Sequence, residues 1–420
     1  MHRRNILAAS AATALTASGL TAAAAGTTPK ARVIVIGGGM AGTTVAKYLR
    51  LWGDGIEVTL VERMPTYTSN IMSSLVLTGQ RTMASLTYKY DTLRSKYGVT
   101  TVFGEVVAVD PVNATVTLAD KTELTADRIV MAPGITFDTV TGLDTPDKMP
   151  HAWTAGPQTT LLARQLNAMR PGGVVVLTIP KTPYRCPPGP YERACLVADW
   201  LRVKKPRSKL IVLDANDDIV VERDNFTNAF LGIHGNVIEY HNKAEVLSVN
   251  TKTMTLHTNL NGRAFTGDVV NMIPRQSAGG LIAKTGLNNA TEGRFAGVDV
   301  LSYASTTPGA SKVHIIGDSS ATTQPKAGHV ANQEAKVCAD ALTRIFAGGS
   351  PDAAPVTNSA CFSTITTTQA SWLHAMYQYD SKTGTMVAVP AATGASVGWD
   401  TESFEDMGKW FGALMADTFA

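Results

Sequence analysis

The sequence has few cysteines and no closely spaced pair of them. Its 420 residues contain four, Cys186, Cys195, Cys338 and Cys361. The spacing Cys-x-x-Cys is absent, which argues against zinc or an iron–sulfur cluster. Cys-x-x-Cys-His is absent as well, so a covalently attached c-type haem is not expected on this chain. The cysteine pattern therefore predicts no metal site.

Charged residues and basic clusters are also scarce. Only 17% of the residues are charged, and the formal net charge is +3 without a run of Lys or Arg. Nothing in this balance indicates a nucleic-acid partner. After residue 26, no stretch approaches the ~18 consecutive apolar residues that a membrane helix needs. We therefore expect no integral membrane segment.

The first 26 residues have the composition of an export signal. Arg3 and Arg4 precede an Ala/Leu-rich stretch that ends in small residues. A twin arginine at this place is typical of the route that carries folded, cofactor-loaded proteins, and a general secretory signal with a chance arginine pair is the alternative. Loss of both arginines would bring the net charge from +3 to +1 (3 − 2). We predict a periplasmic location, an oxidising compartment that permits one disulfide.

Hydrophobic and glycine patterns predict an α/β fold with two Rossmann-like units. Short apolar runs at 32–36, 56–61 and 128–132, with a helix up to about residue 50, are typical of a doubly wound sheet. Runs at 102–109 and 115–118 predict a β-meander. A second unit begins near residue 156, with strands at 173–179 and 209–213 and helices at 158–170 and 191–202. A final strand at 313–316 precedes a helix at about 329–346.

A Gly-rich turn follows the first predicted strand. It reads Gly37-Gly38-Gly39-Met40-Ala41-Gly42 and matches G-x-G-x-x-G. In such a turn Gly37 permits the tight bend, Gly39 lets the backbone approach a pyrophosphate, and Gly42 lets helix and strand pack closely. The pyrophosphate would lie at the positive end of the following helix. Glu62, at the end of the second strand, could bind ribose hydroxyls, so this context predicts a dinucleotide site.

Two further segments favour FAD over NAD as the dinucleotide. Ala132-Pro133-Gly134 ends a strand, as the second turn of two-dinucleotide flavoproteins does. The segment 313–318, VHIIGD, is similar to their third motif, in which the aspartate contacts the ribityl chain of the flavin. A turn or N-cap role for Asp318 is the alternative. We expect a discontinuous FAD-binding domain at 30–150 and 290–350, a second Rossmann-like domain at 151–289, and a C-terminal α+β interface domain at 351–420.

The second unit has a proline-rich loop where a second Gly-rich turn would be needed. Prolines occur at positions 180, 183, 187, 188 and 190, and they supply no backbone N–H groups. Such a loop cannot form the nest of donors that cradles a pyrophosphate, so a nicotinamide donor is disfavoured. Cys186 lies in this loop shortly before a helix, a location that can stabilise a thiolate. A buried structural cysteine is an equally open interpretation.

The loop at 184–194, YRCPPGPYERA, resembles the active-site loop of the flavoprotein subunit of flavocytochrome c sulfide dehydrogenases. The similarity runs from about residue 32 to 420 and includes HAW at 151–153, PKAG at 325–328, NSAC at 358–361 and DTF at 417–419. The resemblance implies oxidation of hydrosulfide through a redox-active Cys186–Cys361 disulfide, with Glu192 as acid/base. It also implies that FAD passes electrons singly to a c-type cytochrome subunit in a heterodimer. The alternatives are that the Cys186–Cys361 disulfide only stabilises the fold and that Glu192 only interacts with the helix dipole in the first turn.

Motifs and resemblance together define a predicted site. The predicted catalytic residues are Cys186, Cys361 and Glu192. The predicted cofactor-binding residues are Gly37, Gly39, Met40, Ala41, Gly42, Glu62, Arg63, Asn70, Val107, Ala132, Pro133, Gly134, Gly317, Asp318 and Lys326. Lys326 is expected beside the reduced flavin, with a solvated turn lysine as the alternative. Family members that bind flavin covalently have a cysteine where Asn70 stands, and no cysteine precedes Cys186, so non-covalent FAD is expected.

Three other functions stay open from the sequence. A sulfide:quinone reductase should have an amphipathic C-terminus that seats on a membrane, but 401–420 carries four acidic residues, Glu402, Glu405, Asp406 and Asp417. A non-catalytic flavin electron-transfer subunit is the second possibility. An NADH-dependent disulfide reductase is the third, and the proline-rich loop opposes it. Aromatic side chains near the C-terminus are candidates for either a partner interface or ordinary core: Trp372, Tyr377, Trp399, Phe404, Trp410 and Phe411.

Overall fold

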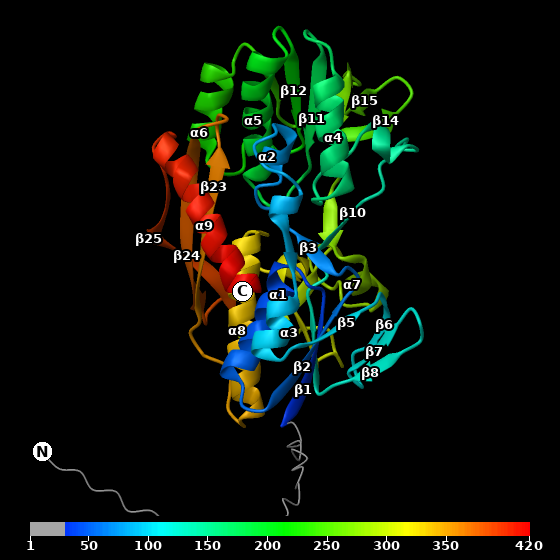
Figure 1. Cartoon of the computed structure of the whole chain (residues 1–420), viewed down its shortest axis with the longest axis vertical. Helices are drawn as coiled ribbons and strands as arrows, with labels where there is room; N and C mark the ends of the chain where they lie inside the picture. The colour runs from blue at the N-terminus through cyan, green and yellow to red at the C-terminus, as the bar shows by residue number, and fades with distance from the viewer. Residues whose placement is uncertain (1–29) are drawn as a thin grey trace, which may run out of the picture.

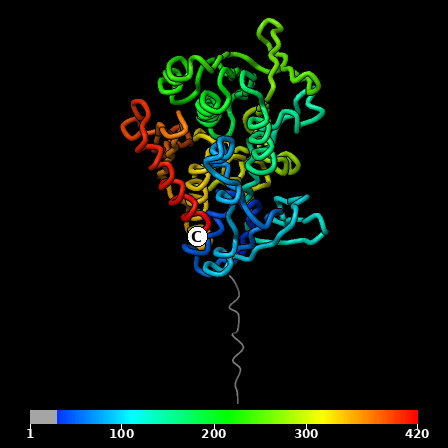
Figure 2. The backbone as a smooth tube through the Cα atoms, turned by 45° about the horizontal axis from the view of Figure 1, so that its top comes forward, coloured from blue at the N-terminus to red at the C-terminus, as the bar shows by residue number. Residues whose placement is uncertain are grey.

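The computed structural model describes residues 30–420, and the predicted export signal at 1–26 lies outside this range. Two sheet-based units lie one above the other, and a C-terminal sheet and helix run along one side of both (Figure 1). The same arrangement is visible in a second orientation, with the last segment following the flank of both units (Figure 2). Within residues 30–420, no helix has the length and apolarity needed to cross a membrane.

The first unit is built on an eight-stranded sheet that joins two distant parts of the chain. Its parallel strands are β1 (Ala31–Ile36), β2 (Ile56–Glu62), β5 (Thr100–Phe103), β9 (Arg128–Met131) and β21 (Val313–Ile315). The edge is completed by β19 (Ala296–Asp299), β20 (Ala304–Ser305) and β22 (Ser320–Ala321). Nearly every residue of β1 is buried, as a strand covered on both faces requires. The predicted α/β fold class is confirmed.

Two long helices of the first unit, α1 (Met40–Trp52) and α8 (Gly328–Phe346), pack against each other (Figure 1). Apolar residues of both helices and of β1 share one buried cluster. Each helix begins directly after a strand or turn of the sheet, so both N-termini lie at its carboxyl edge. That edge is where open α/β sheets bind ligands.

A small antiparallel sheet differs from the sequence-based expectation. Residues 102–109 do not form one strand, because Gly104 and Glu105 lie outside the strands and separate β5 from β6 (Val106–Asp110). Strand β5 joins the large parallel sheet, whereas β6 pairs with β7 (Thr115–Leu118) and β8 (Glu123–Thr125). Apolar residues lie on both sides of Gly104 and Glu105, and apolarity alone does not mark the position where a chain leaves one sheet for another.

The second unit has a four-stranded parallel sheet in the order β13-β12-β11-β17. Its strands are β11 (Val174–Ile179), β12 (Lys209–Asp214), β13 (Ile238–His241) and β17 (Val269–Asn271), and its main helices are α4 (Pro157–Ala168), α5 (Gly189–Lys204) and α6 (Arg223–Asn228). Helix α5 is buried along most of its length, since it lies between this sheet and the C-terminal strands.

The C-terminal part is an antiparallel sheet followed by one helix. Strands β23 (Val356–Thr364), β24 (Ala370–Asp380) and β25 (Thr385–Ala395) pair in that order, and α9 (Thr401–Phe419) follows. The remaining elements are short: α2 (Ser74–Leu77), α3 (Asp91–Tyr97), α7 (Gly280–Lys284), β3 (Thr66–Thr68), β4 (Thr87–Lys89), β10 (Ile135–Phe137), β14 (Val246–Asn250), β15 (Thr255–Thr258), β16 (Ala264–Thr266) and β18 (Gln276–Ala278).

Candidate active site

A cavity of about 560 Å³ lies where the three parts of the chain meet. It is lined by segments that are far apart in the sequence, from the Gly-rich turn to helix α9. The sequence-predicted residues that line it are Gly37, Gly39, Met40, Ala41, Glu62, Arg63, Asn70, Ala132, Pro133, Gly134, Cys186, Glu192, Gly317, Asp318 and Cys361. The structure therefore brings both predicted reactive cysteines and most of the predicted cofactor residues to one cavity.

The Gly-rich turn has the geometry that close approach of a phosphate requires. Gly37 has a φ of +101°, a conformation that favours glycine. A Cβ on Gly42 would lie 1.8 Å from the carbonyl oxygen of Gly37, so only glycine allows the helix to pack this closely on the strand. Helix α1 begins after Gly39 without a side-chain cap, which leaves its first N–H groups facing the cavity. Such a helix start is an anion site.

Glu62 is fixed at the end of β2 by two backbone amides. Its Oε2 accepts a hydrogen bond from the N–H of Gly38 at 2.6 Å, and its Oε1 accepts one from the N–H of Met64 at 3.0 Å. Each carboxylate oxygen can accept a second bond. The carboxylate is therefore held in place at the cavity wall with spare capacity for ribose hydroxyls.

Asp318 presents a buried oxygen without a partner. Within the described chain its Oδ1 accepts no hydrogen bond, and its Oδ2 lies 4.0 Å from Nη1 of Arg185. Burial raises the pKa of this carboxyl, and the Arg185 and Lys326 charges oppose that shift. A buried polar atom needs a partner, so a ligand hydroxyl fits here. The free oxygen, the uncapped α1 terminus and the oriented Glu62 together fit an FAD molecule.

The second helix start at the cavity belongs to α8. This helix begins after Ala327, again without a side-chain cap, and Ala327, Gly328 and His329 line the cavity. A Cβ on Gly328 would lie 2.8 Å from Cδ1 of Ile71, so glycine keeps this helix terminus close to the segment after β3. The positive end of α8 would favour negative charge on a ligand in this part of the cavity.

Cys186 is held in an unusual backbone conformation in the proline-rich loop. Its φ is +59°, which non-glycine residues seldom adopt, and its N–H donates to the carbonyl of Lys326 at 2.6 Å. A Cβ on Gly189 would lie 2.8 Å from the sulfur of Cys186, so the first turn of α5 packs directly on the thiol. Burial, reinforced by the Glu192 charge, raises the pKa of this thiol to about 12.

Cys361 reaches the same cavity from the C-terminal sheet. It lies on β23, and burial together with the charges of Cys186, Glu222 and Glu192 raises its thiol pKa well above the ordinary range. All four cysteines are thiols in this structure. Cys195 and Cys338 are fully buried within α5 and α8, away from the cavity lining. Only Cys186 and Cys361 are thus positioned to react with a molecule in the cavity.

Glu192 is the carboxyl group nearest in sequence to the Cys186 loop. It lies in the first turn of α5, and its Oε1 accepts a hydrogen bond from Oγ1 of Thr364 on β23 at 3.1 Å. Burial raises its pKa to about 7, with Thr364 and Arg193 opposing the shift and Glu222 adding to it. A carboxyl group with such a pKa can both donate and accept a proton near neutral pH.

Three predicted residues do not line this cavity. Gly42 is packed beneath the turn, which is the role expected of it. Val106, and not Val107, lines the cavity, because the register of β6 is irregular between Val106 and Ala108 and Val107 points out, 40% exposed. Nζ of Lys326 donates to the carbonyl of Ser320 at 2.7 Å and lies 3.8 Å from the centre of the Phe295 ring, so its charge is directed away from the cavity.

Several lining residues were not predicted from the sequence: Trp153, Arg185, Arg193, His329, Phe362, Met407 and Trp410. Trp410 was expected at a partner interface or in the core, and it packs against the rings of Phe362 and His329 at the cavity instead. Phe411 is core. Arg185 directly precedes Cys186 and Trp153 belongs to the HAW segment at 151–153, and these are weak signals that could have identified them. Met407 and Trp410 become lining residues only through the docking of α9.

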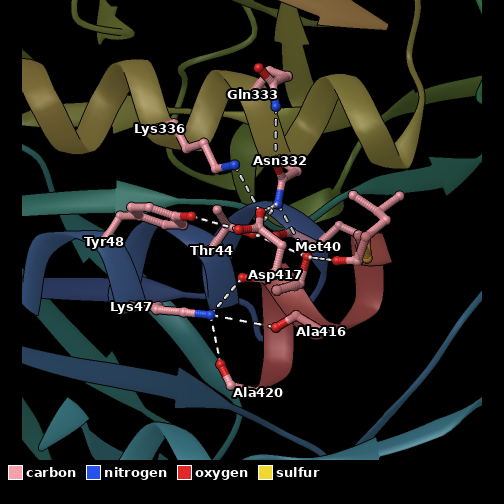
Figure 3. Close-up of polar contacts among 12 residues, drawn as sticks. Met40, Thr44, Lys47, Tyr48, Asn332, Gln333, Lys336, Ala416, Asp417 and Ala420 are labelled. Atoms are coloured by element: carbon pink, nitrogen blue, oxygen red, sulfur yellow. Dashed lines mark hydrogen bonds and ion pairs between the residues drawn. The ribbon is translucent and has the colours of Figure 1, made fainter. Parts of the chain in front are cut away.

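A polar cluster holds the end of α9 against α1 and α8 (Figure 3). The carboxylate of Asp417 accepts hydrogen bonds from Tyr48 at 2.5 Å and Asn332 at 2.8 Å, and it pairs with Lys336 at 2.9 Å. From α1, Nζ of Lys47 donates to the carbonyls of Asp417 at 2.9 Å and Ala420 at 2.6 Å. The helix that closes one wall of the cavity is thus tied to the two helices whose N-termini face it.

Comparisons with known proteins assign the class first. Residues 31–162 match the family described as pyridine nucleotide-disulphide oxidoreductase. The fold is similar to that of the sulfide:quinone oxidoreductase from Aquifex aeolicus, with a TM-score of 0.76, 15% identity, and 92% of this chain and 91% of that chain covered. It is also similar to an NAD-dependent persulfide reductase from A. fulgidus, with a TM-score of 0.61, 14% identity, and 92% and 77% covered. The chain is therefore an oxidoreductase of the two-dinucleotide flavoprotein class.

Two further matches give the family. Residues 159–274 match the central part of the sulfide dehydrogenase (flavocytochrome c) flavoprotein chain, and residues 353–419 match the flavin-binding part of flavocytochrome c sulphide dehydrogenase. The chain belongs to this flavoprotein family, as the resemblance of the Cys186 loop implied, and FAD is its cofactor.

A curated relative matches over a much shorter stretch. The probable ferredoxin reductase CtmF of Castellaniella defragrans is 36% identical over 106 residues, which is 24% of this chain. The match spans 26% of that relative's length, about a quarter.

Proposed function

We propose that this protein oxidises hydrosulfide at Cys186 and Cys361 and passes the electrons through FAD to a separate c-type cytochrome subunit. One observation carries the proposal: two cysteines from distant segments line a cavity together with Asp318, the α1 start and Glu192. The sulfide-related family supports the choice of substrate.

The proposed chemistry is thiol–disulfide exchange. In the oxidised state Cys186 and Cys361 form one sulfur–sulfur bond. Hydrosulfide attacks one of the two sulfurs, so the bridge breaks, a new bond joins the substrate sulfur to the attacked cysteine, and the other cysteine leaves as a thiolate. When bound, FAD supplies the acceptor for the electron pair. The substrate sulfur is thereby oxidised while the bridge is reduced.

Glu192 is proposed to accept and donate the protons that move during this exchange. The persulfide formed from hydrosulfide carries one proton, and the Glu192 carboxylate can accept it. Because burial raises the pKa of Glu192 to about 7, the group can also return a proton to the leaving thiolate. Burial raises the pKa of both cysteine thiols, so a nearby proton donor favours protonation of the cysteine thiolate that leaves in the exchange.

A nicotinamide donor is not part of the proposal. Acidic residues at the end of the second strand of a nucleotide-binding unit bind the ribose. The residue at that place in the second unit, Asp214, is fully buried and already accepts hydrogen bonds from Tyr191 at 2.6 Å and Tyr240 at 2.8 Å. The proline-rich loop adds to this argument because it lacks amide donors.

The FAD is proposed to be bound without a covalent link. The first cysteine of the chain is Cys186, so no thioether can form with the segment after β3. Oδ1 of Asn70 accepts a hydrogen bond from the N–H of Ala155 at 2.7 Å, which ties that segment to the loop before α4. Acid precipitation should release all of the FAD into the supernatant.

The partner and location follow from the sequence. The chain contains no Cys-x-x-Cys-His, so a haem would reside on another polypeptide in a heterodimer. Arg3 and Arg4 support a periplasmic location reached by the twin-arginine route.

Anaerobic titration with sulfide, followed at the flavin absorption bands, tests the function. The wild-type protein should bleach, and Cys186→Ser and Cys361→Ser should not. Cys195→Ser and Cys338→Ser are matched controls and should bleach normally. A Cys186→Ser variant that bleaches like the wild type would refute the mechanism. The bleached protein should reduce a c-type cytochrome faster than a soluble quinone, and the opposite order would refute the proposed acceptor.

A further inference from the structure

Glu222 forms two short hydrogen bonds to the strand pair that carries Cys361. Its Oε2 accepts from Oγ of Ser363 at 2.6 Å, and its Oε1 accepts from Oγ of Ser371 at 2.6 Å. The two serines are direct cross-strand partners in β23 and β24, and both are fully buried. One carboxyl group therefore bridges two strands close to the position of Cys361.

The backbone of Glu222 is held in an uncommon conformation. Its φ is +48°, in the left-handed region, directly before the start of α6. Non-glycine residues persist there only when the surroundings over-determine them, and such positions cluster at functional sites. The pair of serine hydroxyls supplies that constraint, since each occupies a different oxygen of the carboxyl group.

The same hairpin is attached to the second unit at other points. Thr364 bonds to Glu192. The N–H and Oγ1 of Thr367 donate to Asp199 at 2.9 and 2.7 Å. Nε2 of His234 lies 2.7 Å from the carbonyl of Ile365. These contacts also hold β23 and the hairpin turn against the second unit, so the fold does not depend on the Glu222 carboxyl group alone.

Glu222 differs from Asp199 in how its charge is balanced. Asp199 pairs with Arg202 at 2.5 Å, whereas no ion pair within residues 30–420 includes Glu222. Its neighbour Arg223 pairs instead with Asp218 at 2.6 Å. The titratable groups on which the Glu222 charge acts are Cys361 on β23, and Glu192 and Cys195 on α5. Burial raises the pKa of Glu222 itself, and its hydrogen bonds from Ser363 and Ser371 oppose that shift. In its charged form, the carboxylate acts on the proposed reactive thiol and on the proposed acid/base group.

We propose that Glu222 is a positioning residue for the reaction, which fixes the Cys361 strand through Ser363 and Ser371 and retains the protons on Cys361 and Glu192 through its negative charge. The inference rests on the proposed function and deepens it. Removal of the charge makes both groups stronger acids, because a like charge disfavours ionisation.

Alkylation of the dithiol protein tests the charge without any sulfide. The holoenzyme is reduced, treated with iodoacetamide at several alkaline pH values, and the Cys361 peptide is quantified by mass spectrometry. In Glu222→Gln the rate at Cys361 should rise about threefold or more at each pH, since a shift of about 0.5 in pKa changes the thiolate fraction by that factor. Asp199→Asn is the matched control, and its rate should equal the wild-type rate because Arg202 already offsets that charge.

Two outcomes would overturn the proposal. Equal rates in Glu222→Gln and wild type would show that the charge does not act on Cys361. An equal rise in Glu222→Gln and Asp199→Asn would show that loosening of the hairpin is responsible. Glu222→Asp keeps the charge, so it should return the rate toward wild type, and a rate as high as that of Glu222→Gln would also refute the role.

A second readout concerns Glu192. In the pH profile of sulfide-driven flavin bleaching, the step that belongs to Glu192 should move to lower pH in Glu222→Gln. The step that belongs to sulfide should be the same in both proteins. An unmoved profile would remove Glu192 from the inference. The alkylation assay contains no sulfide. A negative result would therefore refute the role of Glu222 without refuting the cysteine mechanism. Conversely, normal bleaching of Cys186→Ser would refute the cysteine mechanism, and the alkylation rates at Cys361 would be a separate result.

Discussion

The backbone N–H of Cys186 donates a 2.6 Å hydrogen bond to the carbonyl of Lys326. Cys186 belongs to the loop after β11 of the second unit, and Lys326 lies directly before α8 of the first. The proposed reactive thiol is therefore fixed by the domain that holds the flavin as well as by its own. Cys186 makes this bond with a φ of +59°.

Gly42→Ala should weaken FAD binding. The added Cβ would lie 1.8 Å from the carbonyl oxygen of Gly37, so either α1 or the turn must move, and the phosphate-binding amides move with them. We expect affinity to fall at least ~10-fold, a loss of about 1.4 kcal/mol. Fluorescence titration of FAD into the apoprotein measures this. Gly412→Ala on α9, where a Cβ has open space, is the control and should bind normally.

Glu192→Gln should slow sulfide-driven bleaching and change its pH dependence. The glutamine keeps the shape and can still accept from Thr364, but it cannot take up a proton. We expect a loss of about 10²-fold, the usual contribution of a positioned acid or base. The step near pH 7 that belongs to Glu192 should disappear, leaving only the step that belongs to sulfide. A variant with an unchanged profile would assign the proton transfer to another group.

Asp417→Ala should loosen α9 and speed the loss of FAD. The change removes the acceptor of Tyr48, Asn332 and Lys336 together. We expect a destabilisation of about 1–3 kcal/mol, since buried donors lose their partner. Thermal unfolding and the FAD dissociation rate measure the two effects. Asp406→Ala on the same helix removes only an exposed pair with Lys409 and should change stability by about 0–1 kcal/mol.

His314 should make folding less favourable in acid. It is fully buried, and burial lowers its pKa from 6.5 to about 4. Between those pH values the unfolded chain binds a proton that the folded chain does not, so stability rises with pH across this window and is lost as pH falls through it. Across this window, the contribution of His314 to the free energy of unfolding changes by ~3 kcal/mol.

Denaturant unfolding at several pH values measures this dependence, and the variant His314→Gln isolates it. The difference in stability between wild type and variant should change between about pH 6.5 and about pH 4 and be constant above that window. His151, whose pKa is also lowered to about 4 by burial, stays in both proteins and cancels. A difference that does not vary with pH would mean that His314 titrates normally in the fold.

The sequence was most informative where one local motif determines both structure and chemistry. The run 31–42 predicts a strand, a turn and a helix, and three of its glycines, Gly37, Gly38 and Gly42, have a steric requirement visible in the structure. Cys186 and Glu192 were identified because both lie in the segment 184–194, which resembles the active-site loop of the family. Asp318 was identified by the apolar strand before it.

Features that depend on long-range packing were not predictable in this way. The direction of the Lys326 side chain depends on Phe295 and on the turn that ends at Ser320, neither of which a motif specifies. The exposure of Val107 depends on the register of β6, and a shift by one residue exchanges the two faces of a strand. Trp410 lines the cavity because α9 is held there by contacts of Asp417 with Tyr48 of α1 and Lys336 of α8, which lie far from it in the sequence.

The docking of α9 on Lys47 and Lys336 also sets an order of events during biogenesis. While the ribosome is still upstream of residue 401, the pocket lacks the wall that Met407 and Trp410 supply, so a captured flavin would be free to leave. Retention of the prosthetic group therefore follows the docking of α9, which is a late step of folding. The twin-arginine route that the Arg3–Arg4 pair predicts carries folded proteins, which agrees with a cofactor that only the docked α9 retains.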